Sequence, residues 1–168
     1  MNILNWFQEP KNEIGFDDIL QYLEDKKNNK ESMILLINTL PITEQDYLII
    51  NTVPCHNEES LINDIIKQSR EIYYTIIIYG KNVLDETTNK KYKQLNNLGF
   101  HNVFIYSGGL FEWGLLQDIY GIDHFQTTTH SKRDLLYYSP NKIIPNNNNT
   151  KYQIPNNNTK YQIIPNTK

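Results

Sequence analysis

The stretch TIIIYGKNVLDETTNKKYKQLNNLGFHNVFIYSGGLFEW, residues 75–113, decides the fold of this chain. Its apolar runs TIIIY (75–79) and VFIY (103–106) have the length and composition of buried strands. A polar loop, residues 80–87, lies between the first run and a helical pattern that ends at LNNLGF. In open parallel sheets, the loop that joins a strand's carboxyl end to a helix N-terminus is the usual place for chemistry. The question of function therefore centres on residues 80–87.

The preceding part of the chain repeats this alternation of strand and helix. FDDILQYLEDKK (16–27) carries apolar residues at helical spacing, and HNEESLINDIIKQ (56–68) predicts a second helix with Asn57 as its N-cap. MILLIN (33–38) and YLIIN (47–51) are the expected earlier strands. This order predicts an α/β fold, in which helices flank a parallel sheet on both faces.

Charge and cysteine content limit the classes of function. Residues 1–127 hold 10 Lys+Arg and 18 Asp+Glu, a net charge of −8, which disfavours nucleic acid as the partner of this part. The single cysteine, Cys55, excludes an internal disulfide and suits a reducing compartment. No apolar run is long enough to span a membrane, and the N-terminus does not have the pattern of a signal peptide. We expect a cytoplasmic or nuclear protein.

The composition divides the chain into three parts. Residues 1–15 are expected to be a lead-in, in which Trp6 and Phe7 pack onto the domain, and residues 16–127 form the domain itself. Residues 128–168 are Asn-rich and contain the imperfect repeat IIPNNNNTKYQ, IPNNNTKYQ, IIPNTK. This repeat cannot bury a core, so we expect a disordered low-complexity tail, which either has no selected role or acts as an interaction arm.

The segment LGFHNVFIYSGGLFEW (98–113) resembles the rhodanese-like domain. The resemblance covers about residues 16–126 and implies a five-stranded parallel sheet wrapped by helices. It also implies that the loop after TIIIY opens, in active members, with a cysteine whose thiolate accepts a sulfur atom. In those members, backbone N–H groups and an arginine of the loop stabilise the anionic persulfide, and related phosphatases use a slightly longer loop for phosphate.

This chain departs from the family pattern at the reactive positions. Gly80 stands where the cysteine is expected, so this position offers no nucleophile. Asp85 and Glu86 lie where the arginine is expected, and Asn38 and Leu40 replace an acid and an arginine of the first strand. A carboxylate about 4 Å from a bound anion repels it by roughly 4 kcal/mol at an effective dielectric near 20. The predicted contact surface is instead a binding loop made of Lys81, Asn82, Asp85, Glu86 and Thr87.

Other candidate residues have a structural and a functional interpretation. Gly99 is expected to end a helix, Gly108 and Gly109 to form a tight strand-to-helix turn, and Trp113 to lie in the core rather than stack on a cofactor. Cys55 precedes an expected helix N-terminus, which makes it a candidate reactive thiol, but it follows the wrong strand for the family that the chain resembles. No metal-ligand spacing joins the candidate ligands, which are Cys55, His56, His101 and His124.

The leading hypothesis is a catalytically inactive rhodanese-like domain that binds or regulates an unknown protein partner, without a cofactor or a metal. One alternative is a sulfurtransferase or phosphatase that uses a displaced nucleophile such as Cys55. A second alternative is a structural or packaged protein that acts through its tail. The sequence leaves the partner and the oligomeric state open.

Overall fold

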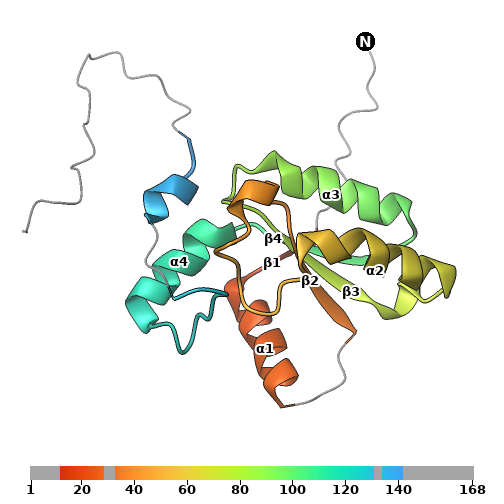
Figure 1. Cartoon of the computed structure of the whole chain (residues 1–168), viewed down its shortest axis with the longest axis horizontal. Coiled ribbons are helices and arrows are strands. Elements are labelled where there is room, and N and C mark those ends of the chain that lie inside the picture. Colours follow the sequence, from red (N-terminus) through yellow and green to blue (C-terminus); the bar gives the residue numbers. More distant parts are fainter. Residues whose placement is uncertain (1–11, 29–32, 131–133, 142–168) are drawn as a thin grey trace, which may run out of the picture.

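The computed structural model describes residues 12–28, 33–130 and 134–141 (Figure 1). In these residues four strands form one sheet in the order β1-β4-β3-β2, and every pair is parallel. The strands are β1 (Glu13–Ile14), β2 (Ile34–Asn38), β3 (Thr75–Tyr79) and β4 (Asn102–Tyr106). The α/β fold with a parallel sheet is therefore confirmed.

Four α-helices cover the two faces of this sheet. α1 and α4 pack on one face, and α2 and α3 pack on the other (Figure 1). The helices are α1 (Phe16–Lys27), α2 (Cys55–Lys67), α3 (Glu86–Asn97) and α4 (Gly109–Tyr120). Short 3₁₀ turns are η2 (Ile42–Glu44), η3 (Glu71–Tyr73) and η4 (Leu135–Tyr138).

The central strand β3 shows why helices cover both faces of the sheet. Its side chains alternate between the faces, as the period of two in a strand requires. Ile76 and Ile78 pack with α2 and α3, whereas Ile77 and Tyr79 pack with α1 and α4. All four are at most 4% exposed, so a continuous apolar run is the pattern that such a strand needs.

The expectation of five strands is wrong for the part of the chain that the structure describes. Residues 47–51 do not form a strand beside β2, although the bridge between Leu36 and Thr52 touches it. Two features prevent the strand: Asn51 has φ +63°, which ends the extended conformation, and Ile50 donates its N–H to the distant carbonyl of Gln126 instead of to a strand. The segment is still buried, because Tyr47, Leu48 and Ile49 are at most 5% exposed.

Three further expectations concern the ends of elements. The expected lead-in contains β1, which pairs with the outer edge of β4, while Trp6 and Phe7 lie outside the described residues. Asn57 is not an N-cap, because α2 already begins at Cys55 after Pro54. Most of the Asn-rich segment lies outside the described residues, but η4 belongs to the packed part, with Tyr138 1% exposed. None of the described helices has the length and apolar character that crossing a membrane requires.

Candidate functional site: the loop after β3

The loop of residues 80–87 begins at Gly80, directly after β3, and ends in the first turn of α3. A Cβ atom at position 80 would overlap the Asp85 carboxylate, with Cγ at 2.9 Å, and would lie 3.0 Å from Thr39 Oγ1. Asp85 therefore fills the space into which a side chain at position 80 would project. A side chain of the loop itself therefore fills the position at which the resemblance places a reactive thiol.

Asp85 is held there by the loop's own donors. Its Oδ2 accepts the N–H of Lys81 at 2.9 Å, and its Oδ1 accepts the N–H of Thr87 at 3.0 Å. The Thr87 hydroxyl donates to the same oxygen at 2.5 Å. The bond from the Thr87 N–H makes Asp85 the N-cap of α3, where the helix dipole favours a negative charge. Two of the loop's amides, those of Lys81 and Thr87, are thus occupied by an internal carboxylate.

The N-terminus of α4 presses against the same loop. Gly109 has φ +60°, and a Cβ there would lie 2.6 Å from Gly80 O and 2.9 Å from Asn82 N. Leu110 and Phe111 donate their N–H groups to the carbonyls of Gly80 and Lys81, at 3.0 and 2.9 Å. The first amides of this second helix are therefore also satisfied by the loop, so they are not free to bind a ligand.

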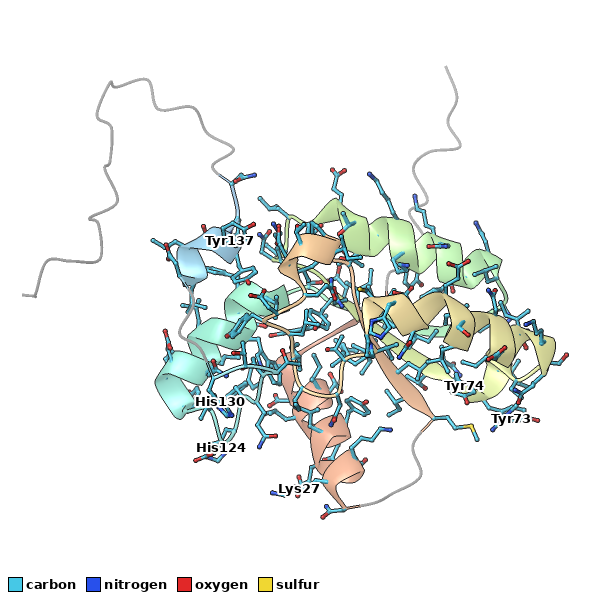
Figure 2. The ribbon with its side chains drawn as sticks, viewed as in Figure 1. Lys27, Tyr73, Tyr74, His124, His130 and Tyr137 are labelled. Carbon is cyan, nitrogen blue, oxygen red and sulfur yellow. The ribbon has the colours of Figure 1, made fainter. Side chains whose placement is uncertain are left out.

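Lys81 forms an ion pair with Glu44 of η2, at 2.8 Å between Nζ and Oε2. Tyr137 lies on η4 (Figure 2). Its hydroxyl donates to Glu44 Oε1 at 2.8 Å, and its ring centroid lies 4.8 Å from Lys81 Nζ. Burial opposes ionisation of Glu44, but the bonds from Lys81 and Tyr137 outweigh it and lower its pKa. The hydrogen bond to Glu44 raises the pKa of Lys81, and this effect is larger than that of burial, which lowers the pKa. Sequence analysis missed Glu44 and Tyr137, since neither belongs to a local motif.

Asn82 connects the loop to η4. Its side-chain amide donates to Tyr138 O at 2.6 Å, and its Oδ1 accepts the N–H of Leu84 at 2.9 Å. Its own carbonyl accepts the N–H of Asp85 at 3.0 Å. Asn82 therefore shapes the turn from within and holds the segment that follows the domain across the loop.

The end of β2, where the resemblance implies an acid and an arginine at positions 38 and 40, carries a neutral amide pair made by Asn38 and Gln45. Asn38 and Gln45 exchange two side-chain hydrogen bonds, of 3.0 and 2.8 Å, and Asn38 Oδ1 also accepts the N–H of Leu40 at 3.0 Å. Asn38 is 5% exposed and Leu40 8%. Both positions are structural here, and Gln45 is a partner that sequence analysis did not single out.

A hollow of about 500 Å³, named the loop hollow below, opens over this site. Among the described residues that line it, Lys81 is the only Lys or Arg, and Asp85 and Glu86 contribute two carboxylates. Asn141, close to the end of the described chain, is also part of its wall. All five of the predicted binding residues thus lie together in one surface depression.

Cys55 does not reach the loop hollow. It is half-buried at the start of α2 and lines a neighbouring hollow of about 290 Å³. Thr39 and Thr87, whose hydroxyls are 2.7 Å apart, belong to the walls of both hollows. Lys91 beside Cys55 is paired with Glu58 at 2.7 Å. The structure therefore does not place this thiol among the loop's backbone amides.

The remaining candidates have structural surroundings. Gly99 has φ +96°, and the bonds Gly99 N–H to Asn96 O and Phe100 N–H to Leu95 O close the end of α3. Trp113 is fully buried and donates its indole N–H to Gln126 O at 3.3 Å. Within residues 12–28, 33–130 and 134–141, no three His, Cys, Asp or Glu side chains are grouped to hold a metal ion.

No protein-family model matches this chain, and no curated protein matches it. Similar solved structures include BH2092 from Bacillus halodurans, with 19% identity, 66% of this chain and 74% of that chain covered, and a TM-score of 0.47. The As-Sb reductase from Leishmania major has 15% identity, covers 66% of this chain and 79% of its own, and has a TM-score of 0.44.

The rhodanese-like domain of Alr3790 from Anabaena has 18% identity, covers 96% of both chains and has a TM-score of 0.43. All three identities are below 25% and all three TM-scores are below 0.5, so no residue role is transferred from these proteins. Rhodanese-like domains are nevertheless among the solved structures to which this chain is similar.

Proposed function

We propose that this chain is a rhodanese-like domain that does not transfer sulfur and that acts by binding a partner through residues 80–87. One observation carries the proposal: the Asp85 carboxylate lies against Gly80 and accepts the N–H groups of Lys81 and Thr87. Sulfur transfer needs a thiolate and an anion-binding loop. The proposal is supported by the glycine at position 80 and by the internal carboxylate that occupies two of the loop's amides.

The outer side of the loop supports a binding role. Val83 is 65% exposed and Leu84 is 45% exposed, although the loop is firmly held from beneath by Asn82 and by α4. A rigid loop that presents two adjacent aliphatic side chains loses little conformational entropy when a partner covers it.

Enzyme assays test the claim that the protein does not transfer sulfur. The full chain, supplied with thiosulfate or with 3-mercaptopyruvate and a thiol acceptor, is expected to show no turnover above the blank. Turnover that disappears in a Cys55→Ser variant would establish Cys55 as a displaced nucleophile and overturn the proposal.

Matched surface variants test the claim that a partner binds through residues 80–87. Val83→Asn/Leu84→Asn changes the loop. Ile72→Asn/Tyr73→Asn changes another exposed apolar pair, on η3, whose two residues are 59% and 62% exposed. Cross-linking followed by mass spectrometry is expected to lose a partner with the loop variant only. If both variants keep the same partners as the parent chain, the loop is not the contact surface.

A further inference from the structure

The loop hollow carries an excess of negative charge. Its lysine, Lys81, is already neutralised by Glu44, at 2.8 Å. Glu86 is exposed and, among the described residues, forms no ion pair with a Lys, Arg or His. Asp85 adds a second carboxylate to the wall. Such a hollow attracts a cationic group and repels an anion.

Apolar surface adjoins these carboxylates. Leu84 lines the loop hollow and Val83 precedes it, and both side chains are largely exposed to solvent. A ligand that suits both features has a cationic side chain next to aliphatic ones. A short extended peptide of the type Lys-aliphatic-aliphatic meets this description.

The chain itself supplies such a peptide at this place. Asn141 lines the loop hollow, and the sequence continues directly as Lys142-Ile143-Ile144-Pro145. Residues 142–168 contain four lysines and no acidic residue, which is the charge opposite to that of the hollow. Because an extended residue spans at most about 3.6 Å, Ile143 begins within roughly 7 Å of a residue of the wall.

We propose that residues 142–145 bind in cis in the loop hollow, with the Lys142 ammonium toward Glu86 and the two isoleucines against Val83 and Leu84. This rests on the proposed function, since it treats the hollow as a binding surface. Weak contacts are sufficient for this binding, because the peptide is covalently joined to a residue of the wall. A short flexible linker gives an effective concentration of about 1 mM, which half-saturates a site with a Kd of about 1 mM.

The sequence provides a matched control for the test. The tetrapeptide Ile-Ile-Pro-Asn occurs at residues 143–146 and again at residues 163–166. Hydrogen exchange of the backbone amides of residues 83–87 is measured in the full chain, in Ile143→Asp/Ile144→Asp and in Ile163→Asp/Ile164→Asp. We expect the first variant to speed this exchange about two- to tenfold and the second to leave it unchanged.

Three outcomes overturn the proposal. These are unchanged exchange in both variants, an equal effect of both variants, and protection in the parent chain that rises with protein concentration. The last outcome would mean that the tail of a second copy occupies the hollow. Turnover in the sulfurtransferase assay tests the proposed function separately, because exchange is measured without substrate and either result can fail alone.

Discussion

The carboxylate of Asp85 occupies the space that a side chain at position 80 would need, and Gly80 is the residue that leaves this space free. Each of the two residues is thus suited to the other. The same carboxylate satisfies the amides of Lys81 and Thr87. The glycine at position 80 and the filling of the loop by Asp85 are therefore one structural arrangement.

A double-mutant cycle tests this relationship. Gly80→Ala is expected to lower the free energy of unfolding by about 1–3 kcal/mol, because the new Cβ displaces the Asp85 carboxylate from its amide partners. In an Asp85→Ala background the same change should cost less, with a coupling of about 1–2 kcal/mol. Urea unfolding of the four proteins measures both quantities.

Gly15→Ala serves as the control for this cycle. Nothing lies within 4 Å of a Cβ at Gly15, and its φ of −92° suits alanine. It should change the free energy of unfolding by no more than about 1 kcal/mol in either background. Strictly additive costs of Gly80→Ala and Asp85→Ala would show that the two residues do not compete for one space.

The contact of α4 with the loop predicts a difference between two glycines of similar backbone conformation. Gly109 and Gly121 have φ of +60° and +93°, so alanine is strained at both, by about 1–2 kcal/mol. Only Gly109 lies against backbone atoms, since a Cβ at this position would be 2.6 Å from Gly80 O. Gly109→Ala should therefore cost at least about 1 kcal/mol more than Gly121→Ala in thermal unfolding.

Equal costs at the two glycines would contradict a close contact between α4 and residues 80–82. The far-ultraviolet circular dichroism of each variant, recorded below the unfolding transition, shows whether the comparison is made between folded proteins.

The ion pair of Glu44 and Lys81 predicts a defined dependence of stability on pH. The pKa of Glu44 is lowered from 4.5 in the folded protein, so its contribution is present above pH 4.5 and is lost as the pH falls through the folded pKa. The pKa of Lys81 is raised from 10.5, so its contribution is present below pH 10.5 and is lost as the pH rises through the folded pKa.

Glu44→Gln should therefore be less stable than the parent chain by about 1–3 kcal/mol at neutral pH, and the difference should shrink in acid. Urea unfolding at a series of pH values measures it. A difference that stays constant down to the most acidic condition would mean that ionised Glu44 does not stabilise the fold.

The hydrogen bonds between Asn38 and Gln45 predict that replacing Asn38, an uncharged residue, lowers the free energy of unfolding. Asn38→Ala leaves the buried N–H of Leu40 and the Oε1 of Gln45 without their partner, which should cost about 1–3 kcal/mol. Asn97→Ala, at an exposed position of α3, should stay within about 0.5 kcal/mol of the parent chain. Similar results for the two variants in chemical unfolding would rule out a structural role of the pair.

Much of the fold follows from short patterns along the chain. The apolar runs at β2, β3 and β4 are of strand length and alternate with helical patterns, which is enough to predict a parallel sheet covered on both faces. The expected strand over residues 47–51 was wrong because Asn51 adopts φ +63° and Ile50 bonds to Gln126. Neither fact has a local signal in an apolar run.

Some features of the candidate site likewise follow from the sequence, and others depend on the tertiary structure. The absence of a thiol at position 80 is a property of one residue, and the sequence alone determined it. Tertiary structure decided where the Asp85 carboxylate points, that Glu44 neutralises Lys81 across 37 residues, and that Asn82 bonds to Tyr138 across 56 residues. It also placed Cys55 outside the loop hollow. The physical reason is that covalent identity is fixed residue by residue, whereas direction, pairing and burial depend on which distant segments the fold brings together.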